Sequence, residues 1–247
     1  WMDKISEKNK MKSKSLPKLI NLIKTYSLDG YAIPKNDEFF SEYADPDRLL
    51  SISNFSGSAG LSIIMIKKNY LFVDGRYLTQ AKKETKNKFN IFEFPKFWPS
   101  DIFKKYKIKP KIGYDPKIFT KKMINRYFGN SCNLVAINKN LVDQIIVRKK
   151  SIEKKMFYNL NSKITGETIN SKIKRLAFIL KKNKIDNLFI SAPENVAWLL
   201  NIRGEDNPNS PIPNCRAIIT KNRKIFILSN EYKIKKVKKN KLYKMVK

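Results

Sequence analysis

The chain has 247 residues, 42% of them apolar and 12% aromatic, which suffices to bury one large core or two modest ones. Its 52 basic and 21 acidic residues give a net charge of +31, but Lys outnumbers Arg 44 to 8. Proteins that read phosphates or bases favour the planar, bidentate guanidinium of Arg. The excess of Lys over Arg therefore favours compositional drift over a nucleic-acid partner. The chain contains no histidine, which excludes Ser-His and Cys-His nucleophile pairs and removes the commonest zinc ligand.

The first half of the chain predicts helices alternating with strands. Apolar residues at 16, 19, 20 and 23 form one stripe of an amphipathic helix, and a turn and a short strand follow at 28–33. The further elements expected are a hairpin of strands 60–66 and 70–73, a helix at 78–85, strands at 90–94 and 111–114, a helix at 120–128 and a strand at 134–137. This alternation predicts a layered α/β domain.

The second half repeats the opening pattern. Residues 173–190 align with residues 16–33 without a gap, at an offset of 157, and Gly30 and Asn187 stand at the position of the turn where a positive φ is expected. In the first copy an Asn-x-x-Gly element at 54–57 and a hairpin at 60–73 follow, and the hairpin leads to Tyr77. In the second copy the same element lies at 201–204, and a hairpin at 217–228 leads to Tyr232. The second copy carries an extra Pro/Asn-rich loop at 205–214. The shared order indicates duplication.

The repeat sets the expected domains. We predict a basic tail at 1–14, a first domain at 15–147, a Lys-rich linker at 148–167 and a second domain at 168–247. The second copy has far fewer residues after its tyrosine than the first has before the linker, so we expect it to be incomplete, with an unpaired sheet edge and a loosely held C-terminal end.

The remaining polar residues indicate no catalytic or metal site. The acidic pairs Asp37/Glu38, Asp45/Asp47 and Glu205/Asp206 are read as solvated turns or loops, because adjacent side chains point apart. Cys132 and Cys215 are interpreted as buried, reduced thiols of a cytoplasmic protein. No secretory signal, phosphate-binding loop or stretch long enough to span a membrane is visible. We therefore expect neither a nucleic-acid nor a membrane partner.

Several motifs resemble those of a known family. Residues 55–60 and 73–81 are similar to the signature of the creatinase/aminopeptidase P N-terminal domain, and residues 41–43, 113–117 and 140–143 fit the same family in order. Residues 166–173 and 195–206 resemble the middle domain of the long, three-domain Xaa-Pro aminopeptidases. The resemblance covers about residues 15–230 and implies two tandem creatinase/prolidase N-terminal-like domains with mixed β-sheets flanked by helices, the second one incomplete.

The resemblance also implies a function for the parent protein. The family has a further, C-terminal pita-bread domain in which two Asp, one His and two Glu hold two metal ions, usually manganese, and a bridging hydroxide attacks the amide before proline. None of these ligands maps onto this sequence, so the chain is expected to bind no cofactor and to be inactive alone. Its expected partners are its own C-terminal catalytic domain, a second copy in a homodimer, and proline-containing peptides.

In the family the N-terminal domains look like a wall of the active-site cleft and a dimer scaffold. By that resemblance the candidates for contacts with substrate or with another domain are Ser58, Asp74, Arg76, Tyr77 and Arg203. Structural explanations stand beside these: a tight turn for the loop at 56–60, a helix cap for Asp74, and a core position for Trp198. Two other hypotheses stay open, a stand-alone, catalytically dead creatinase-like binding module and, less favoured, a basic nucleic-acid-binding protein, which would show steeply salt-dependent affinity.

Overall fold

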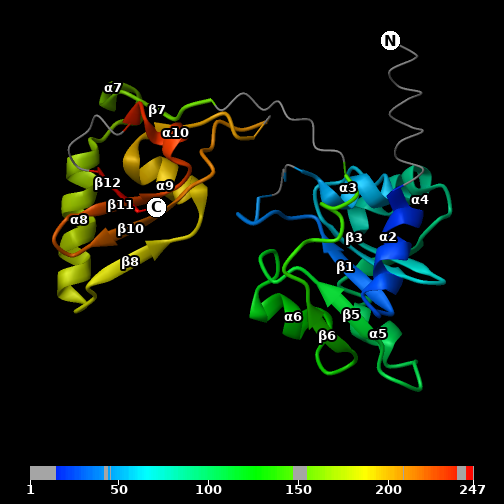
Figure 1. Cartoon of the computed structure of the whole chain (residues 1–247). Helices are drawn as coiled ribbons and strands as arrows, with labels where there is room; N and C mark the ends of the chain where they lie inside the picture. The colour runs from blue at the N-terminus through cyan, green and yellow to red at the C-terminus, as the bar shows by residue number, and fades with distance from the viewer. Residues whose placement is uncertain are drawn as a thin grey trace, which may run out of the picture. The chain divides into compact units, whose positions relative to one another are not determined.

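The computed structural model describes residues 15–41, 44, 46–146, 155–207, 209–237 and 243–246. The chain forms two compact units, residues 1–148 (unit one) and 149–247 (unit two). Figure 1 shows that each unit has its own sheet and its own helices, so each is described by itself. The tail predicted at 1–14 lies outside the described residues, as does the first part of the predicted linker.

Unit one is a six-stranded mixed sheet with helices on both faces. Its helices are α2 (Ser15–Thr25), α3 (Arg48–Ser53), the short 3-10 helix η1 (Gly75–Tyr77), α4 (Leu78–Thr85), α5 (Pro99–Phe103) and α6 (Lys121–Tyr127). Its strands are β1 (Gly30–Pro34), β2 (Gly60–Met65), β3 (Asn69–Asp74), β4 (Asn90–Phe94), β5 (Lys111–Tyr114) and β6 (Asn133–Ala136). They are ordered β4-β3-β2-β1-β5-β6 (Figure 1). The predicted strands and helices are confirmed, whereas α3 and α5 were not predicted.

Alternation along the strands gives the sheet of unit one two apolar faces. One face, which includes Tyr31 and Ile33 of β1, packs against α2, α3 and α4 and against the segment at 137–142. The other face, which includes Ala32, packs against α5, α6 and the segment at 118–132. Unit one is therefore a three-layer α/β/α structure, in line with the predicted fold class.

Unit two repeats part of this arrangement. Its helices are α7 (Ser162–Thr165), α8 (Ile169–Lys182), α9 (Pro193–Leu200) and α10 (Glu231–Ile234). Its strands are β7 (Tyr158–Asn159), β8 (Asn187–Ile190), β9 (Ile202–Arg203), β10 (Arg216–Thr220), β11 (Ile225–Leu228) and β12 (Tyr243–Val246). The main sheet has the order β12-β11-β10-β8, and β7 pairs with β9 alone. Because β12 runs parallel to β11 as β4 runs parallel to β3, the two sheets share the order of four strands.

The same left-handed helix end recurs in both units. Asn54 ends α3 and Asn201 ends α9, each in the left-handed conformation, with φ values of 64° and 51°. Asparagine tolerates this conformation and so marks the C-terminus of a helix. The Asn-x-x-Gly repeat is thus a repeated helix end.

One predicted backbone feature is wrong. The residues with positive φ before the first strands are Ser27 and Lys184, at 52° and 56°, and not Gly30 and Asn187. Gly30 is explained by close packing, because a Cβ there would lie 2.4 Å from the sulfur of Met65.

Burial corrects three further predictions. Trp198 is 55% exposed, because its ring lies on the outside of α9, and it is therefore not a core residue. Asp37 and Asp206 are buried rather than solvated: Asp37 accepts hydrogen bonds from the backbone of Phe39 and Ser41, and Asp206 pairs with Lys233. The interpretation of Cys132 and Cys215 as buried, free thiols is confirmed.

Candidate functional site

Two segments of unit one that are distant in the chain meet at one end of its sheet. The loop at 55–59 leads into β2 and the turn at 75–77 follows β3, and Gly60 lies opposite Val73 in the register of these strands. The hydroxyl oxygens of Ser58 and Tyr77 are 2.9 Å apart, and the Tyr77 ring packs edge-on against Phe55 with 5.8 Å between centroids. The loop and the turn are thus held together by one hydrogen bond and one aromatic contact.

Four of the five predicted site residues lie in this place. We use the term loop–turn cluster for the residues Ser56, Ser58, Asp74, Arg76, Tyr77, Gln80 and Glu84. The fifth residue, Arg203, belongs to β9 of unit two. There it donates hydrogen bonds to the carbonyl oxygens of Ala197 and Ile202 at 3.1 and 2.8 Å, so its described contacts anchor the end of α9.

Asp74 and Arg76 form a local pair at the start of the turn. The Asp74 carboxylate accepts two hydrogen bonds from the Arg76 guanidinium, at 2.9 and 3.4 Å, and one from the Arg76 backbone N–H at 3.0 Å. These hydrogen bonds, the side-chain ones foremost, lower the pKa of the Asp74 carboxyl below its ordinary value. Asp74 therefore caps η1, as its structural explanation predicts.

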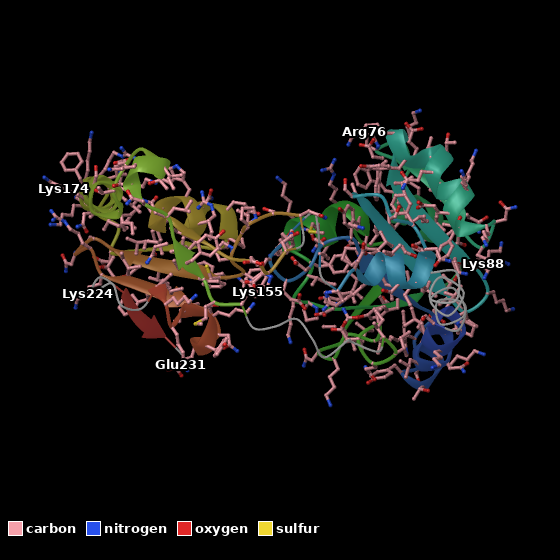
Figure 2. The ribbon with its side chains drawn as sticks, turned by 90° about the horizontal axis from the view of Figure 1, so that it is seen from above. Arg76, Lys88, Lys155, Lys174, Lys224 and Glu231 are labelled. Carbon is pink, nitrogen blue, oxygen red and sulfur yellow. The ribbon has the colours of Figure 1, made fainter. Side chains whose placement is uncertain are left out.

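The guanidinium of Arg76 is nevertheless presented outward. Its side chain is 77% exposed, and Figure 2 shows Arg76 on the outer surface of unit one. Its central carbon lies 5.7 Å from the centroid of the Tyr77 ring. A guanidinium is a group that binds carboxylates through charge-assisted hydrogen bonds.

The loop at 56–60 is shaped by its own packing. A Cβ at Gly57 would lie 2.2 Å from the Phe55 ring, so glycine is required for that ring to fold under the loop. The tight-turn explanation of this loop is therefore supported by a specific contact.

Sequence reasoning missed a second carboxylate in the cluster. Glu84 on α4 accepts hydrogen bonds from the backbone N–H and hydroxyl of Ser56, both at 2.7 Å, and from Gln80 at 3.1 Å. Burial opposes its ionisation, but the hydrogen bonds from Ser56 and Gln80 prevail, so the pKa of Glu84 lies below its ordinary value. The i, i+4 spacing of Gln80 and Glu84 on a predicted helix was the signal available in the sequence.

A buried ion network at another edge of unit one was also missed. The Arg48 side chain is 1% exposed and donates two hydrogen bonds of 2.9 Å to Asp143 and one of 2.7 Å to Glu38. Burial works against its charge, but these hydrogen bonds raise the pKa of Arg48 above its ordinary value. The network ties α3 to the segment after β6 and so gives Asp143 of the 140–143 motif a structural role.

The described residues offer no site for a metal ion. No group of three or more His, Cys, Asp or Glu is placed to hold one in the part of the chain that the structure describes. Within that same part, no helix is both long and apolar enough to cross a membrane.

The chain is similar to known proteins over most of its length. Residues 147–246 match the family described as Creatinase/Prolidase N-terminal domain. Probable Xaa-Pro aminopeptidase P from Laccaria bicolor is 31% identical over 230 residues, which is 87% of this chain and 35% of the relative. The counterpart from Pyricularia oryzae is 33% identical over 225 residues, or 84% of this chain and 36% of the relative. The chain thus spans about a third of the length of these curated relatives.

A solved structure extends the match to three dimensions. The crystal structure of X-prolyl aminopeptidase from Caenorhabditis elegans, described as a cytosolic enzyme with a di-nuclear active site, covers 95% of this chain with a TM-score of 0.83 and 26% identity. This chain in turn covers 42% of that structure. The sequence and fold together place this chain with the N-terminal, creatinase/prolidase-like region of the Xaa-Pro aminopeptidases.

Proposed function

We propose that this chain is the non-catalytic N-terminal region of a metal-dependent Xaa-Pro aminopeptidase, which removes the residue before proline from the N-terminus of peptides. One observation carries the proposal: the alignment with a relative covers 87% of this chain but only 35% of the relative's length. The catalytic chemistry is then supplied by the remaining polypeptide of the parent enzyme. Two manganese ions are expected there and none in this chain.

The carboxylates of the two units support this division of labour. Asp37, Asp47 and Asp74 cap turns or helices, and Asp143 and Asp206 pair with basic side chains. Because these carboxylates are hydrogen-bonded to backbone N–H groups or paired with basic side chains, they are not arranged around a shared metal position.

The loop–turn cluster is the surface that we assign to the cleft. Its exposed Arg76 suits the carboxylate of a bound peptide or a carboxylate of a neighbouring subunit. The hydrogen bond between Ser58 and Tyr77 and the bonds of Glu84 to Ser56 hold the loop and the turn in place beneath it. The same proposal includes a role of this region in supporting a homodimer of the enzyme in the cytoplasm.

Substitution of Arg76 in the full-length enzyme tests the assignment. Arg76→Ala is expected to raise KM for a short proline-containing peptide about tenfold, because a charge-assisted hydrogen bond to a carboxylate is lost, with metal content unchanged. Lys88→Ala is the matched control, since Lys88 is an exposed cation outside the cluster (Figure 2). Equal kinetic constants for Arg76→Ala and Lys88→Ala would remove Arg76 from the cleft.

A further inference from the structure

A groove of about 640 Å³ lies at the end of the unit-one sheet that is opposite the loop–turn cluster. Its two walls are the hairpin turn between β2 and β3, at residues 65–68, and the segment 106–110 that leads from α5 into β5. Gly60, the first residue of β2, directly follows the loop of the loop–turn cluster, whereas Met65, the last residue of β2, lines the groove. The groove is therefore separate from the surface assigned to the cleft.

The lining of the groove presents apolar side chains to solvent. Met65 and Pro110 are buried, whereas Ile66 and Tyr106 are 37% and 40% exposed. Ile108 is 84% exposed, which is the largest value among the exposed large apolar residues of the described chain. A partner that covers these side chains removes apolar area from water, and this favours association.

The rim of the groove is basic. Lys67 and Lys68 stand on the hairpin turn and Lys109 on the opposite wall, all three are exposed, and we call them the rim lysines. The ion pairs among the described residues of unit one use other cations, namely Lys35, Arg48, Arg76, Lys96 and Lys104. Asp29 is the only acidic residue in the described lining, and its carboxylate accepts a hydrogen bond of 2.7 Å from the backbone N–H of Lys111. The rim lysines therefore give the groove a positive field above an apolar floor.

Both walls of the groove are held by contacts within unit one. The Tyr106 ring packs edge-on against Phe103 with 6.1 Å between centroids, and its hydroxyl oxygen lies 3.3 Å from that of Tyr70 on β3. The hairpin turn is closed by a hydrogen bond of 3.0 Å from the backbone N–H of Met65 to the carbonyl oxygen of Lys68. A groove that is formed before its partner arrives loses less conformational entropy on binding.

We propose that this groove binds an acidic segment of a partner protein, in which one apolar or aromatic side chain stands between aspartate or glutamate residues. The apolar side chain lies between Ile66 on one wall and Tyr106 and Ile108 on the other. Its acidic neighbours pair with the rim lysines of the two walls. Charge complementarity selects the partner, and burial of Ile108 and its neighbours adds affinity.

Three other occupants match the groove less well. A second copy of the chain carries the same net charge of +31 and is repelled. A nucleic acid is read mainly through Arg, and the described lining contains Lys but no Arg. A lipid surface is flat on the scale of this groove, whereas Met65 and Pro110 are buried at its floor.

Binding of a labelled peptide to this chain tests the proposal. The probe is a fluorescein-labelled peptide with a central phenylalanine flanked by glutamates, and fluorescence anisotropy at physiological salt measures its affinity. The double variant Lys67→Glu, Lys109→Glu is expected to weaken binding at least about tenfold, because two attractive charges become repulsive. The matched control is Lys174→Glu, Lys224→Glu, which makes the same change of charge on exposed lysines of unit two (Figure 2). It should weaken binding less than about twofold, because salt screens charges that do not contact the peptide.

The apolar part of the proposal is tested by a second pair of variants. Ile108→Ser should weaken binding of the phenylalanine peptide about tenfold and leave binding of a peptide with a central glycine unchanged, because only the phenylalanine packs against Ile108. Ile164→Ser is the matched control and should change neither affinity, since Ile164 is 72% exposed on α7 of unit two. Both variants change an exposed side chain, so the folded core of each unit is kept.

Three results would overturn the proposal. The first is equal weakening by the two charge-reversed double variants, because the peptide would then bind the net charge of the chain and not the groove. The second is equal affinity for the phenylalanine and glycine peptides. The third is an effect of Ile108→Ser on binding to phosphatidylserine vesicles that is absent with the peptide, because the groove would then contact lipid. These measurements read binding and not peptide cleavage, so their failure is distinguishable from failure of the proposed function.

Discussion

At the scale of single residues, the most consequential side chain of unit one is one that no motif indicated. Arg48 is a buried guanidinium held by Asp143 and Glu38. Sequence reasoning assigned Glu38 to a solvated loop and noted Asp143 only within a family motif. A buried ion pair between positions 95 apart in the chain leaves no periodic signal. Local devices were easier to predict: the cap at Asp74 follows from an acidic residue just before a short helix.

Arg48→Met should destabilise unit one by about 3 kcal/mol, because it leaves carboxylates without their buried cation. The partial exposure of Asp143 and Glu38 places the cost at the lower end of the range for buried pairs. Denaturant unfolding of the whole chain, read at the core strands of unit one by hydrogen exchange, measures the effect.

The matched control is Lys104→Ala, which removes an exposed pair with Asp101 at 3.5 Å and should cost less than about 1 kcal/mol. The double variant Arg48→Met, Asp143→Leu should recover part of the lost stability, because replacing both residues by apolar ones leaves no unpaired Asp143 carboxylate. If Arg48→Met unfolded no more readily than Lys104→Ala, the network would not support unit one.

At the scale of elements, the strands were predicted more reliably than the short helices. The hairpins and β4, β5 and β6 stand out as apolar runs between Gly, Pro and Asn, and the structure has them within a residue or two. α3 and α5 are one or two turns long and show no full period of the apolar pattern. Trp198 was assigned to the core because it stands in an apolar run, but only one face of α9 is buried.

The two left-handed helix ends give a matched pair of substitutions. Asn54→Gly should leave stability within about 0.5 kcal/mol or raise it, because glycine adopts a positive φ without strain. Asn201→Gly should cost about 2 kcal/mol, because the Asn201 side chain accepts a hydrogen bond from buried Lys172 at 2.8 Å and donates one to the carbonyl oxygen of Glu167 at 2.8 Å. Urea midpoints of the two variants check the difference. Equal losses of stability in the two variants would show that the left-handed conformation alone, and not the side-chain hydrogen bonds, determines what both residues contribute to stability.

At the scale of the whole molecule, the repeat was the most informative part of the sequence. It predicted two similar α/β units and the shared order of helix, strand, helix end and hairpin, which the two sheets confirm. The predicted limits of the domains stay a prediction. The strand β12 was not predicted, since it lies in a Lys-rich tail whose composition hides its alternation.

The chain has a net charge of +31, and exposed lysines lie on both units. Figure 2 shows Lys88 on unit one and Lys174 and Lys224 on unit two directed outward. Exposed lysines favour solubility, whereas bidentate reading of phosphates favours Arg. Charge therefore contributes nothing to the assignment of function, which depends on the match to the Xaa-Pro aminopeptidases.

The most direct test of the central claim is a peptidase assay on this chain with an Arg-Pro-Pro peptide and added manganese, read together with the metal content of the protein. The division of labour between this region and the rest of the enzyme predicts no cleavage and no bound metal. Metal-dependent cleavage by this chain would contradict it, since the carboxylates of these two units would then perform the hydrolysis themselves.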